Sequence, residues 1–571
     1  MRFKSKTKNG FTVYAVSGTD TVSFAIDFNR NKAAGLLGFA VERQDLTENE
    51  RYFMRGFKVF EVLVPKPDSD MVVSTFEHPV QSFVWDDFTA KPEHEYIYYF
   101  YPLKGTPKSL DRSLKAIEIK VKTEILFAPD AEHHVFFNRG VASSQAYKIR
   151  FDNKAPDQLE GAKKQEAYDW LSRNLDNALY AFIDKAQAGD QLLGCFYEFH
   201  YSPVLKAFKA ALDRGVDVQV VIDAKANAQD FPRKKNLETL TEVGFPLDRI
   251  HQRSANPSYI QHNKFAVWMK AGVPQEVWTG STNISEGGIF GHTNVGHWIV
   301  NKSIAEKYRG YWELLKNNGM GGAFKTAVVA LSGDLDIGMV KALPNGTVSI
   351  FSPRNKKTML NTYVDLIDQM EQLGCITLAF GVSKVFKDKL QYHTPQSPIL
   401  FMLLEKPDVA NKKKPAAFIK LDWHQNIYQS VGSAIKDGLN RWVKETNQKM
   451  MGLNNHVVYI HSKFLLHDPL GDAPIVVTGS ANFSEPSTVS NDENMVIIKG
   501  DMRVADIYFT EFNRLFNHYY FRLVYNKSLE QNRQSTEQSL FLKEDDSWLE
   551  KYKVGSLRYK RIKLYKEMKG F

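Results

Sequence analysis

The sequence predicts an α/β protein made of two duplicated halves that pair about a pseudo-two-fold axis and are preceded by a small all-β sandwich. The first 125 or so residues are rich in short β-type runs separated by turn-forming residues. From about residue 160, helical and strand patterns alternate. A 25-residue segment then recurs 199 residues further along the chain. That spacing is far longer than the roughly 20 to 50 residues of solenoid repeats, so it indicates two duplicated domains.

The composition is that of a folded protein with several domains. The chain has 571 residues, of which 43% are hydrophobic and 24% charged, which argues against a disordered or fibrous protein. It has no stretch of about 20 apolar residues and no secretory signal at its start, so we expect a cytoplasmic protein without a transmembrane segment. Its two cysteines, Cys195 and Cys375, are predicted to be buried apolar residues, because they are too few for a disulfide framework and lack zinc-site spacing.

Residues 1–126 form the predicted β-sandwich. The runs FTVYAV, TVSFAIDF, FKVFEVLV, EYIYYFYPL and AIEIKVK each predict a strand. The segment from Trp85 to Tyr98 resembles the approach to a late strand in fibronectin type III domains, so we expect a fibronectin type III-like module with a binding or spacing role. His78 and His94 are predicted to be surface or turn histidines.

The two α/β halves are predicted at residues 127–340 and 341–525. In the first half, QLLGCFYEF and VDVQVVID predict strands and PVLKAFKAALDRG predicts a helix closed by glycine. The tripeptide Leu193-Gly-Cys195 recurs as Leu373-Gly-Cys375, which predicts that the two cysteines occupy equivalent core positions.

Residues 526–571 form a basic C-terminal extension. From Lys551 to Phe571 there are eight basic residues and one acid, giving +7 of the chain's net +9. Basic residues interleaved with tyrosines indicate an anionic partner, and Lys560 and Arg561 are candidate substrate-binding residues. A solvated terminal segment is the alternative.

The repeat brings the same three polar residue types into each half. His262–Glu286 aligns without a gap with His461–Glu485, and 11 of the 25 positions are identical. In each copy histidine and lysine alternate in an apolar run, which places both side chains on one face of a strand. A Gly-Ser-x-x-Asn turn then follows a second strand, with glycine permitting tight backbone geometry and asparagine offering an amide.

Two imidazoles, two ammonium groups and two amides around one pocket match a tetrahedral anion. They suit phosphodiester cleavage, in which one histidine attacks phosphorus, the other protonates the leaving oxygen, and lysines and asparagines hold the non-bridging oxygens. The lysines supply the charge that Mg²⁺ would otherwise bring, so we expect neither metal nor cofactor. The candidate catalytic residues are His262, Lys264, Asn283, His461, Lys463 and Asn482, with Ser281 and Ser480 as candidate substrate-binding residues.

These paired HxK and GSxxN elements resemble the phospholipase D superfamily over roughly residues 127–525. The resemblance implies two α-β-α sandwich halves and a phosphohistidine intermediate. The second half fits the superfamily's HxKxxxxD pattern fully, which makes Asp468 a candidate catalytic residue. Glu493 follows in Asn491-Asp-Glu493; in that family such a glutamate hydrogen-bonds the imidazole, which implies that Glu493 orients His461.

The first half departs from this pattern at two positions. Met269 stands where Asp468 stands in the repeat, and in Asn294-Val-Gly296-His297 a glycine replaces the glutamate, leaving His262 without the expected carboxylate. The superfamily includes enzymes that resolve tyrosine–DNA adducts and lack that aspartate, so its absence does not imply inactivity. The resemblance implies that His262 is the nucleophile and His461 the acid, whereas carboxylate support around His461 also suits the reverse.

The repeat indicates the reaction class and leaves three hypotheses for the function. A metal-independent nuclease acting on DNA or RNA is favoured, because a basic, aromatic-bearing tail suits a nucleic-acid backbone. The alternative is a phospholipase D that hydrolyses a phosphatidylcholine-type headgroup to phosphatidate, with the tail at a lipid surface. The third is a non-catalytic phosphate-binding protein. The sequence makes no prediction of oligomeric state.

Overall fold

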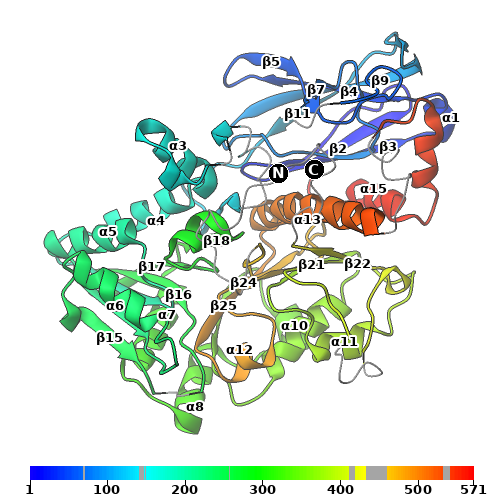
Figure 1. Ribbon diagram of the computed structural model, residues 1–571. Helices are drawn as coiled ribbons and strands as arrows, with labels where there is room; N and C mark the ends of the chain where they lie inside the picture. The colour runs from blue at the N-terminus through cyan, green and yellow to red at the C-terminus, as the bar shows by residue number, and fades with distance from the viewer. Residues whose placement is uncertain are drawn as a thin grey trace.

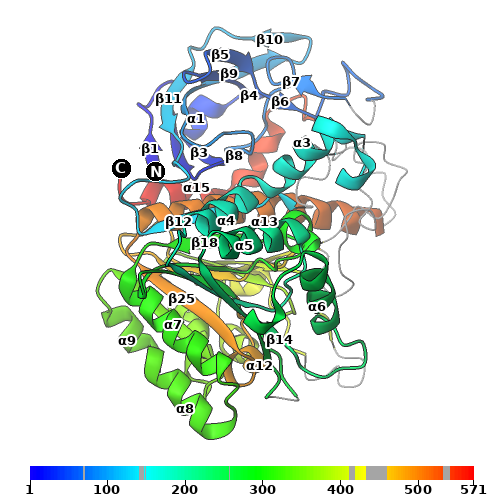
Figure 2. The same cartoon turned by 90° about the vertical axis from the view of Figure 1, so that its left-hand side faces the viewer.

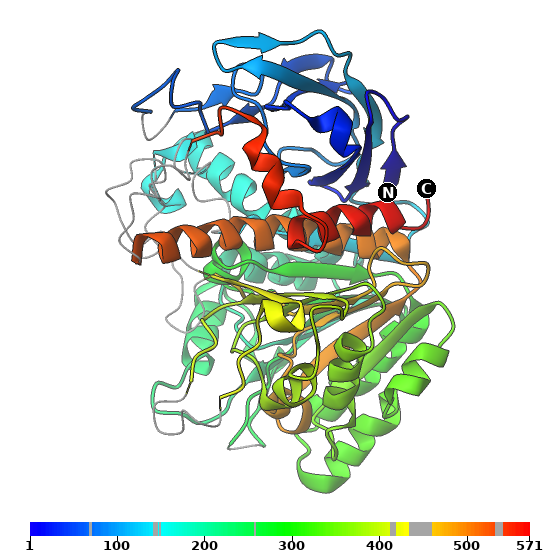
Figure 3. The ribbon, with the colours of Figure 1, turned by 90° about the vertical axis from the view of Figure 1, so that its right-hand side faces the viewer.

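The structure, a computed structural model, describes residues 1–571 except 68–70, 141–146, 148–149, 153, 256–257, 411–417, 433–458 and 531–540. Two seven-stranded sheets lie side by side in the lower part of the molecule, and the long helix α13 separates them from the N-terminal β-strands (Figure 1). The two turned views show the same order of layers (Figures 2 and 3). In the described part of the chain, no helix combines the length and the apolar character needed to cross a bilayer.

The N-terminal region folds into antiparallel sheets. One sheet has the order β1-β2-β3-β8, and the other has the order β10-β9-β4-β5 with β11 also paired to β9. The strands are β1 Arg2–Lys4, β2 Phe11–Ser17, β3 Val22–Phe28, β4 Gly38–Asp45, β5 Glu50–Phe53, β6 Arg55–Gly56, β7 Val73–Ser74, β8 Val84–Asp87, β9 Glu95–Thr106, β10 Ser109–Asp111 and β11 Ile117–Lys122, with a short helix α1 at Arg30–Ala33.

One predicted strand of this region is wrong. The run FKVFEVLV, residues 57–64, forms no strand, and only Phe60 makes an isolated bridge, to Leu542. Only some of its apolar residues are buried: Val59 and Phe60 are buried, whereas Val62 and Leu63 are exposed. Hydrophobic content alone therefore did not distinguish this loop from a strand, because its burial is against the distant C-terminal segment.

The first α/β half holds a mixed sheet of order β12-β18-β17-β16-β13-β14-β15. Its strands are β12 His133–Phe137, β13 Gln191–Phe196, β14 Asp217–Asp223, β15 Ile250–Arg253, β16 Lys264–Lys270, β17 Val273–Gly280 and β18 Val295–Ile299. Its helices are α3 Gly161–Ser172, α4 Leu175–Asp184, α5 Ser202–Asp213, α6 Arg233–Glu242, α7 Lys302–Lys316, α8 Gly321–Ser332 and α9 Ile337–Ala342.

The second half holds a sheet with the same strand order and the same parallel and antiparallel pairings, β19-β25-β24-β23-β20-β21-β22. Its strands are β19 Gly346–Ser352, β20 Leu373–Leu378, β21 Ile399–Leu404, β22 Ile427–Val431, β23 Phe464–His467, β24 Ile475–Gly479 and β25 Glu493–Lys499. Its helices are α10 Thr358–Asp368, α11 Lys384–Leu390, α12 Glu485–Val489 and α13 Met502–Glu530. The predicted boundary at residue 525 therefore falls inside α13.

The two sheets share one hydrophobic core. In β13, Leu193 and Cys195 face this shared core, whereas Leu192 and Phe196 face helices of the first half, as the two-residue period of a strand requires. Apolar side chains of α7 and α13, such as Trp312 and Phe512, fill the space beside both sheets. This common core fixes the positions of the two HxK segments relative to each other.

Cys195 and Cys375 are free and buried, as predicted, but they are not equivalent. Cys195 lies opposite Phe265, and Cys375 lies opposite Leu466. The counterpart of Phe265 in the repeat is Phe464, so the two cysteines are offset by two residues. The repeated Leu-Gly-Cys is therefore a coincidence of composition.

The C-terminal segment packs back onto the N-terminal strands. It contains the 3₁₀ helix η8 at Asp546–Tyr552 and helix α15 at Leu557–Glu567. Trp548, Tyr552 and Ile562 belong to the core of the N-terminal sheets, and α15 lies beside α13 (Figures 1 and 3). The aromatic residues of this segment thus contribute to the core.

Candidate active site

The two histidines of the repeat lie just before strands β16 and β23. His262 and His461 are 7% and 4% exposed, and both following lysines, Lys264 and Lys463, are 1% exposed. Nζ of Lys264 donates a hydrogen bond to the carbonyl oxygen of His262 at 2.6 Å, and Lys463 donates likewise to His461. Each HxK element is therefore a buried unit with the ammonium group folded against the histidine backbone.

Each HxK element is hydrogen-bonded to the opposite half of the molecule. The backbone N–H of His262 donates to the carbonyl oxygen of Asp492 at 2.9 Å, and that of His461 donates to Thr293 at 3.3 Å. Thr293 and Asp492 are themselves 199 positions apart, so the two contacts are related by the repeat. The histidines therefore meet at the interface between the two sheets.

The imidazole rings are held by the opposite half in the same crossed manner. Nδ1 of His262 lies 3.0 Å from Oε2 of Glu493, and Nδ1 of His461 lies 2.9 Å from Oδ1 of Asn294. The hydroxyls of Ser480 and Ser281 donate to those same acceptor side chains at 2.7 and 2.8 Å. With Nδ1 engaged on each ring, Nε2 is the nitrogen left for chemistry.

Two expectations about carboxylate support are corrected by this geometry. Glu493 contacts His262, not His461. Its counterpart in the first half is not Gly296, because Gly296 pairs with Gly280 whereas Met495 pairs with Gly479. Counting back two residues in each strand makes Asn294 the counterpart of Glu493. The register of the strand ladders establishes this equivalence, and the 199-residue offset of the repeat gives the same pair.

Burial dominates the electrostatics of the pocket. It lowers the pKa of His262 to about 4, although the neighbouring Glu493 carboxylate acts in the opposite direction. It lowers the pKa of Lys264 to about 8 and holds the pKa values of His461 and Lys463 well below their usual ranges. The charge of Lys264 also lowers the pKa of Lys463, and Glu493 offsets these effects only in part, so the pocket favours a bound anion.

The asparagines of the two GSxxN turns complete the pocket. Asn283 is buried and Asn482 half-buried, and within the described residues neither side-chain oxygen has a hydrogen-bond partner. The preceding glycines are required sterically: a Cβ at Gly280 would lie 2.2 Å from the carbonyl oxygen of Val295, and one at Gly479 would lie 2.3 Å from that of Asn494. The turns thus present two amide groups from corresponding positions.

Three of the predicted site residues act on neighbouring protein groups in this structure. Ser281 and Ser480 donate to Asn294 and Glu493, so they position the groups that hold the imidazoles. Asp468 accepts hydrogen bonds from three consecutive backbone N–H groups at the start of β20, at 2.7, 2.8 and 3.0 Å. Its contacts therefore fasten the start of a strand.

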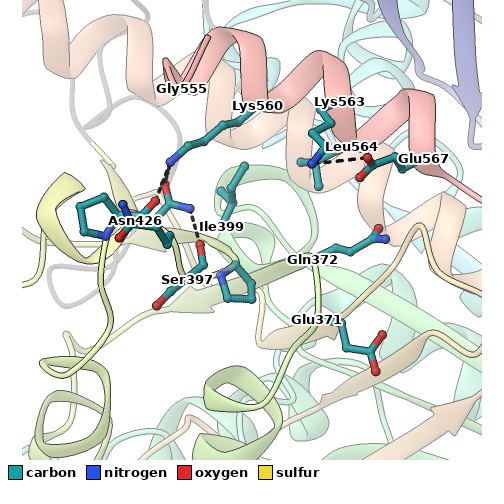
Figure 4. A pocket seen from close by; sticks show the side chains of 13 residues that line it. Glu371, Gln372, Ser397, Ile399, Asn426, Gly555, Lys560, Lys563, Leu564 and Glu567 are labelled. Carbon is teal, nitrogen blue, oxygen red and sulfur yellow. Dashed lines mark hydrogen bonds and ion pairs between the residues drawn. The ribbon is translucent and has the colours of Figure 1, made fainter.

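Lys560 and Arg561 lie on α15, and none of their contacts in the described structure joins them to the histidines. Nζ of Lys560 donates to the carbonyl oxygen of Pro395 at 2.9 Å and to Oδ1 of Asn426 at 2.8 Å, and Arg561 donates to Asn517. Lys560 borders a cavity of about 490 Å³ between α15 and the second half (Figure 4). Their predicted role in substrate binding stays a prediction.

Carboxylates at strand ends also brace the site, and sequence reasoning missed them. Oδ1 of Asp223, the last residue of β14, accepts the backbone N–H of Gln261 at 2.7 Å, and burial raises the pKa of Asp223 to about 7. Glu405, just after β21, accepts the backbone N–H groups of Tyr459 and Ile460. The available signal was an acidic residue closing an apolar run, in VDVQVVID and in ILFMLLE.

A rim of aromatic and basic residues begins beside His262. The loop after β14 starts at the Asp223 brace, and its Lys225 donates to the carbonyl oxygen of Ser258 at 2.8 Å. Further along, Phe231 is 42% exposed, and its ring centroid lies 6.3 Å from that of His200. Helix α6 then opens with three basic residues, Arg233, Lys234 and Lys235.

Comparison with known proteins gives one match to a family model. Residues 179–315 and 419–516 match the model described as "Cardiolipin synthase, PLD-like domain". No curated protein matches the chain. These two segments are therefore similar to a PLD-like domain, where PLD stands for phospholipase D.

Several solved structures are similar to parts of the chain. A polyphosphate kinase from Porphyromonas gingivalis is 14% identical with a TM-score of 0.36; the match covers 58% of this chain and 46% of the kinase, so less than half of that protein's length is represented. A phosphatidylserine synthase from Haemophilus influenzae is 12% identical with a TM-score of 0.43; the match covers 70% of this chain and 94% of the synthase. Nuc, a phospholipase D family member from Salmonella typhimurium, is 25% identical with a TM-score of 0.21; the match covers 25% of this chain and 88% of Nuc.

Proposed function

We propose that this protein is a duplicated phosphodiesterase that works through a phosphohistidine intermediate, with nucleic acid as its favoured substrate. The observation that carries the proposal is the crossed pair of imidazoles. Nδ1 of His262 is bonded to Glu493 and Nδ1 of His461 to Asn294, which orients both rings and leaves each Nε2 for reaction.

The unlike partners of the two rings assign their roles. The carboxylate of Glu493 stabilises the positive charge that develops on His262 when its Nε2 forms a bond to phosphorus. The amide of Asn294 is neutral, so His461 gives up its proton more readily, and that proton passes from Nε2 to the leaving oxygen as the P–O bond breaks. Water then attacks phosphorus, its proton goes to His461, and the P–N bond to His262 breaks to release a phosphomonoester.

The remaining pocket residues bind the phosphoryl oxygens. Lys264 and Lys463 would donate to the non-bridging oxygens together with the amides of Asn283 and Asn482. A bound phosphodiester would raise the depressed pKa values of both lysines and of His461, because it supplies the negative charge that the buried groups lack. Substrate binding thereby favours the protonated His461 that the first step needs.

The rim beside the pocket supports a nucleic-acid substrate. An exposed aromatic ring, Phe231, next to Lys234 and Lys235 suits a single strand, because bases stack on aromatic rings and phosphates pair with lysines. The basic C-terminal segment gives weaker support for a nucleic-acid substrate. Its Tyr552 and Tyr565 are buried and cannot stack on bases, so only its basic residues could contact the nucleic acid.

A phospholipid is the second candidate substrate. The description of the matching family model names a phospholipid synthase, which favours hydrolysis of a phosphatidylcholine-type headgroup to phosphatidate as the alternative. A phosphate-binding protein without catalysis is the third candidate.

The test is cleavage of labelled single-stranded DNA, duplex DNA, RNA and phosphatidylcholine vesicles in excess EDTA. His262→Ala and His461→Ala proteins are the active-site variants, and His424→Ala, which changes an exposed histidine paired with Asp422, is the matched control. Nucleic-acid cutting that survives chelation and the control but neither active-site variant supports the proposal. Headgroup release alone supports the phospholipase, and phosphate binding without either reaction supports the third candidate.

A further inference from the structure

Three potential metal ligands converge in the N-terminal sheets, outside the histidine pocket. Asp45 is the last residue of β4, Glu48 lies in the turn to β5, and His94 directly precedes β9. The ligand atoms of these residues all lie within 4.8 Å of one another. The adjoining strands β4, β5 and β9 are labelled in Figure 2 at the end of the molecule opposite α8.

The hydrogen bonds of His94 define which ring nitrogen faces the two acids. Nδ1 lies 2.8 Å from the carbonyl oxygen of Pro92, so in the neutral ring it carries the hydrogen. Nε2, which then holds the lone pair, lies 3.7 Å from Oδ2 of Asp45 and 3.3 Å from Oε1 of Glu48. This nitrogen is buried, and in the described structure its contacts with the two carboxylates do not have the geometry of a full hydrogen bond. A lone pair facing two carboxylates is unfavourable, and either a proton on Nε2 or a cation bound between the three groups removes the repulsion.

The three side chains are already fixed by their surroundings. The backbone of His94 pairs with Thr123, and its ring stacks on Tyr96 with centroids 5.7 Å apart. The side chain of Asp45 is 2% exposed, and its Oδ1 accepts two backbone N–H groups, which leaves Oδ2 toward His94. A ligating histidine commonly donates its other N–H to a backbone carbonyl, as His94 does to Pro92.

We propose that Asp45, Glu48 and His94 form a structural site for a divalent transition-metal ion, with Zn²⁺ as the best fit. One neutral imidazole and two carboxylates supply a nitrogen and two or more oxygens with a charge of −2, a donor set that zinc accepts. Mg²⁺ prefers oxygen ligands alone and fits less well. The ion would join the β4–β5 turn to the start of β9. This proposal revises the sequence-based prediction that His94 is a surface or turn histidine.

Lys91 is the competitor of this ion. Its Nζ lies 2.6 and 2.5 Å from the two carboxylate oxygens of Glu48, and its side chain is 51% exposed. An exposed lysine can swing into solvent when a divalent ion enters, since surface ion pairs contribute little to stability. Removing Lys91 should therefore strengthen metal binding. If the three residues form only a network of ion pairs, removing Lys91 would instead weaken that network and would not strengthen metal binding.

The experiment is a calorimetric titration of the full chain, without added histidine tags, with Zn²⁺ and in parallel with Mg²⁺. We expect one Zn²⁺ site in the N-terminal region, binding at least ten-fold more weakly in His94→Ala and Asp45→Asn and about three-fold more tightly in Lys91→Met. Mg²⁺ should bind at least ten-fold more weakly than Zn²⁺. The matched control is His393→Ala, because His393 pairs with a single acid, Asp368, at 3.0 Å.

Two further measurements keep the result unambiguous. Titration in the His262→Ala background removes any zinc held by the catalytic histidine, and the absorption spectrum of the Co²⁺-loaded protein reports ligation by His94 even if His94→Ala is unstable. Zinc affinity that is unchanged in Asp45→Asn, or weaker in Lys91→Met, would overturn the proposal. None of these readouts uses phosphodiester cleavage, so the site stands or falls independently of the proposed function.

Discussion

Nδ1 of His262 lies 3.0 Å from Oε2 of Glu493, although the two residues are 231 positions apart and belong to different halves of the molecule. The corresponding contact, from His461 to Asn294, crosses the interface in the other direction. Neither half therefore contains a complete site, because each imidazole depends on the other half for its orientation. Pairing of the halves and assembly of the site are one event.

Replacing Glu493 with glutamine should lower kcat on the order of 100-fold, the scale of a lost acid–base contribution. It should also move the basic limb of the pH profile. Lys264 must stay protonated to bind phosphate, and its pKa of about 8 makes kcat/KM fall as the pH rises through that value. Glu493 raises this pKa, so without its charge the fall should begin at lower pH.

The measurement is kcat/KM from pH 5 to 10 for the wild-type and Glu493→Gln proteins. Asp492→Asn is a matched control, because Asp492 is the neighbouring buried acid and pairs with Arg253 instead of an imidazole. An unshifted basic limb in Glu493→Gln would mean that the carboxylate does not act on the pocket lysine.

The two histidines should differ in a trapping experiment. If His262 is the nucleophile, brief incubation of the His461→Ala protein with a ³²P-labelled substrate that has a good leaving group should leave label on the protein, because the base for hydrolysis is missing. The His262→Ala protein should carry no label. Acid-labile, base-stable label identifies a phosphohistidine. Label found in His262→Ala and absent from His461→Ala would reverse the assigned roles.

Asp468→Ala should reduce stability and leave catalysis nearly unchanged. The carboxylate accepts three backbone hydrogen bonds at the start of β20, and loss of such charge-assisted bonds costs about 1–3 kcal/mol. Urea denaturation measures that loss, and kcat should change by less than about three-fold at a temperature where both proteins are folded. Asp468→Asn keeps one acceptor oxygen and should be intermediate in stability. A large fall in kcat in the folded Asn variant would restore Asp468 to the catalytic set.

The rim beside His262 should contribute to single-stranded DNA binding in two separable ways. Lys234→Ala with Lys235→Ala should reduce the slope of log K against log salt by about 1.4, at about 0.7 per phosphate contact. Phe231→Ala should cost about 1–3 kcal/mol of binding at every salt concentration, because stacking is not a charge effect. Fluorescence anisotropy measures both. The double substitution Lys120→Ala and Lys122→Ala on β11 is the control, because it removes the same charge from another part of the protein. An equal reduction of the salt slope in this control would argue against a contact specific to the rim.

Much of the fold and the polar residues of the candidate site were predictable from local patterns. The repeat of histidine, lysine and asparagine at equal spacing identified both halves and the polar inventory of the pocket, because those features are written in consecutive residues. Strand and helix periodicity likewise predicted alternating elements from residue 160 onward, since burial on one face imposes a period of two or 3.6.

The partner of each imidazole was decided by tertiary structure alone. Asn294 and Glu493 are counterparts by the repeat offset of 199 residues and by the register of the β-ladders, but they reach the opposite histidine only because the two sheets pack on one shared core. The same holds for Asp468, whose place in the motif suggested chemistry and whose contacts are with backbone amides. Sequence specifies which groups are present, whereas the packing of distant segments decides which of them touch.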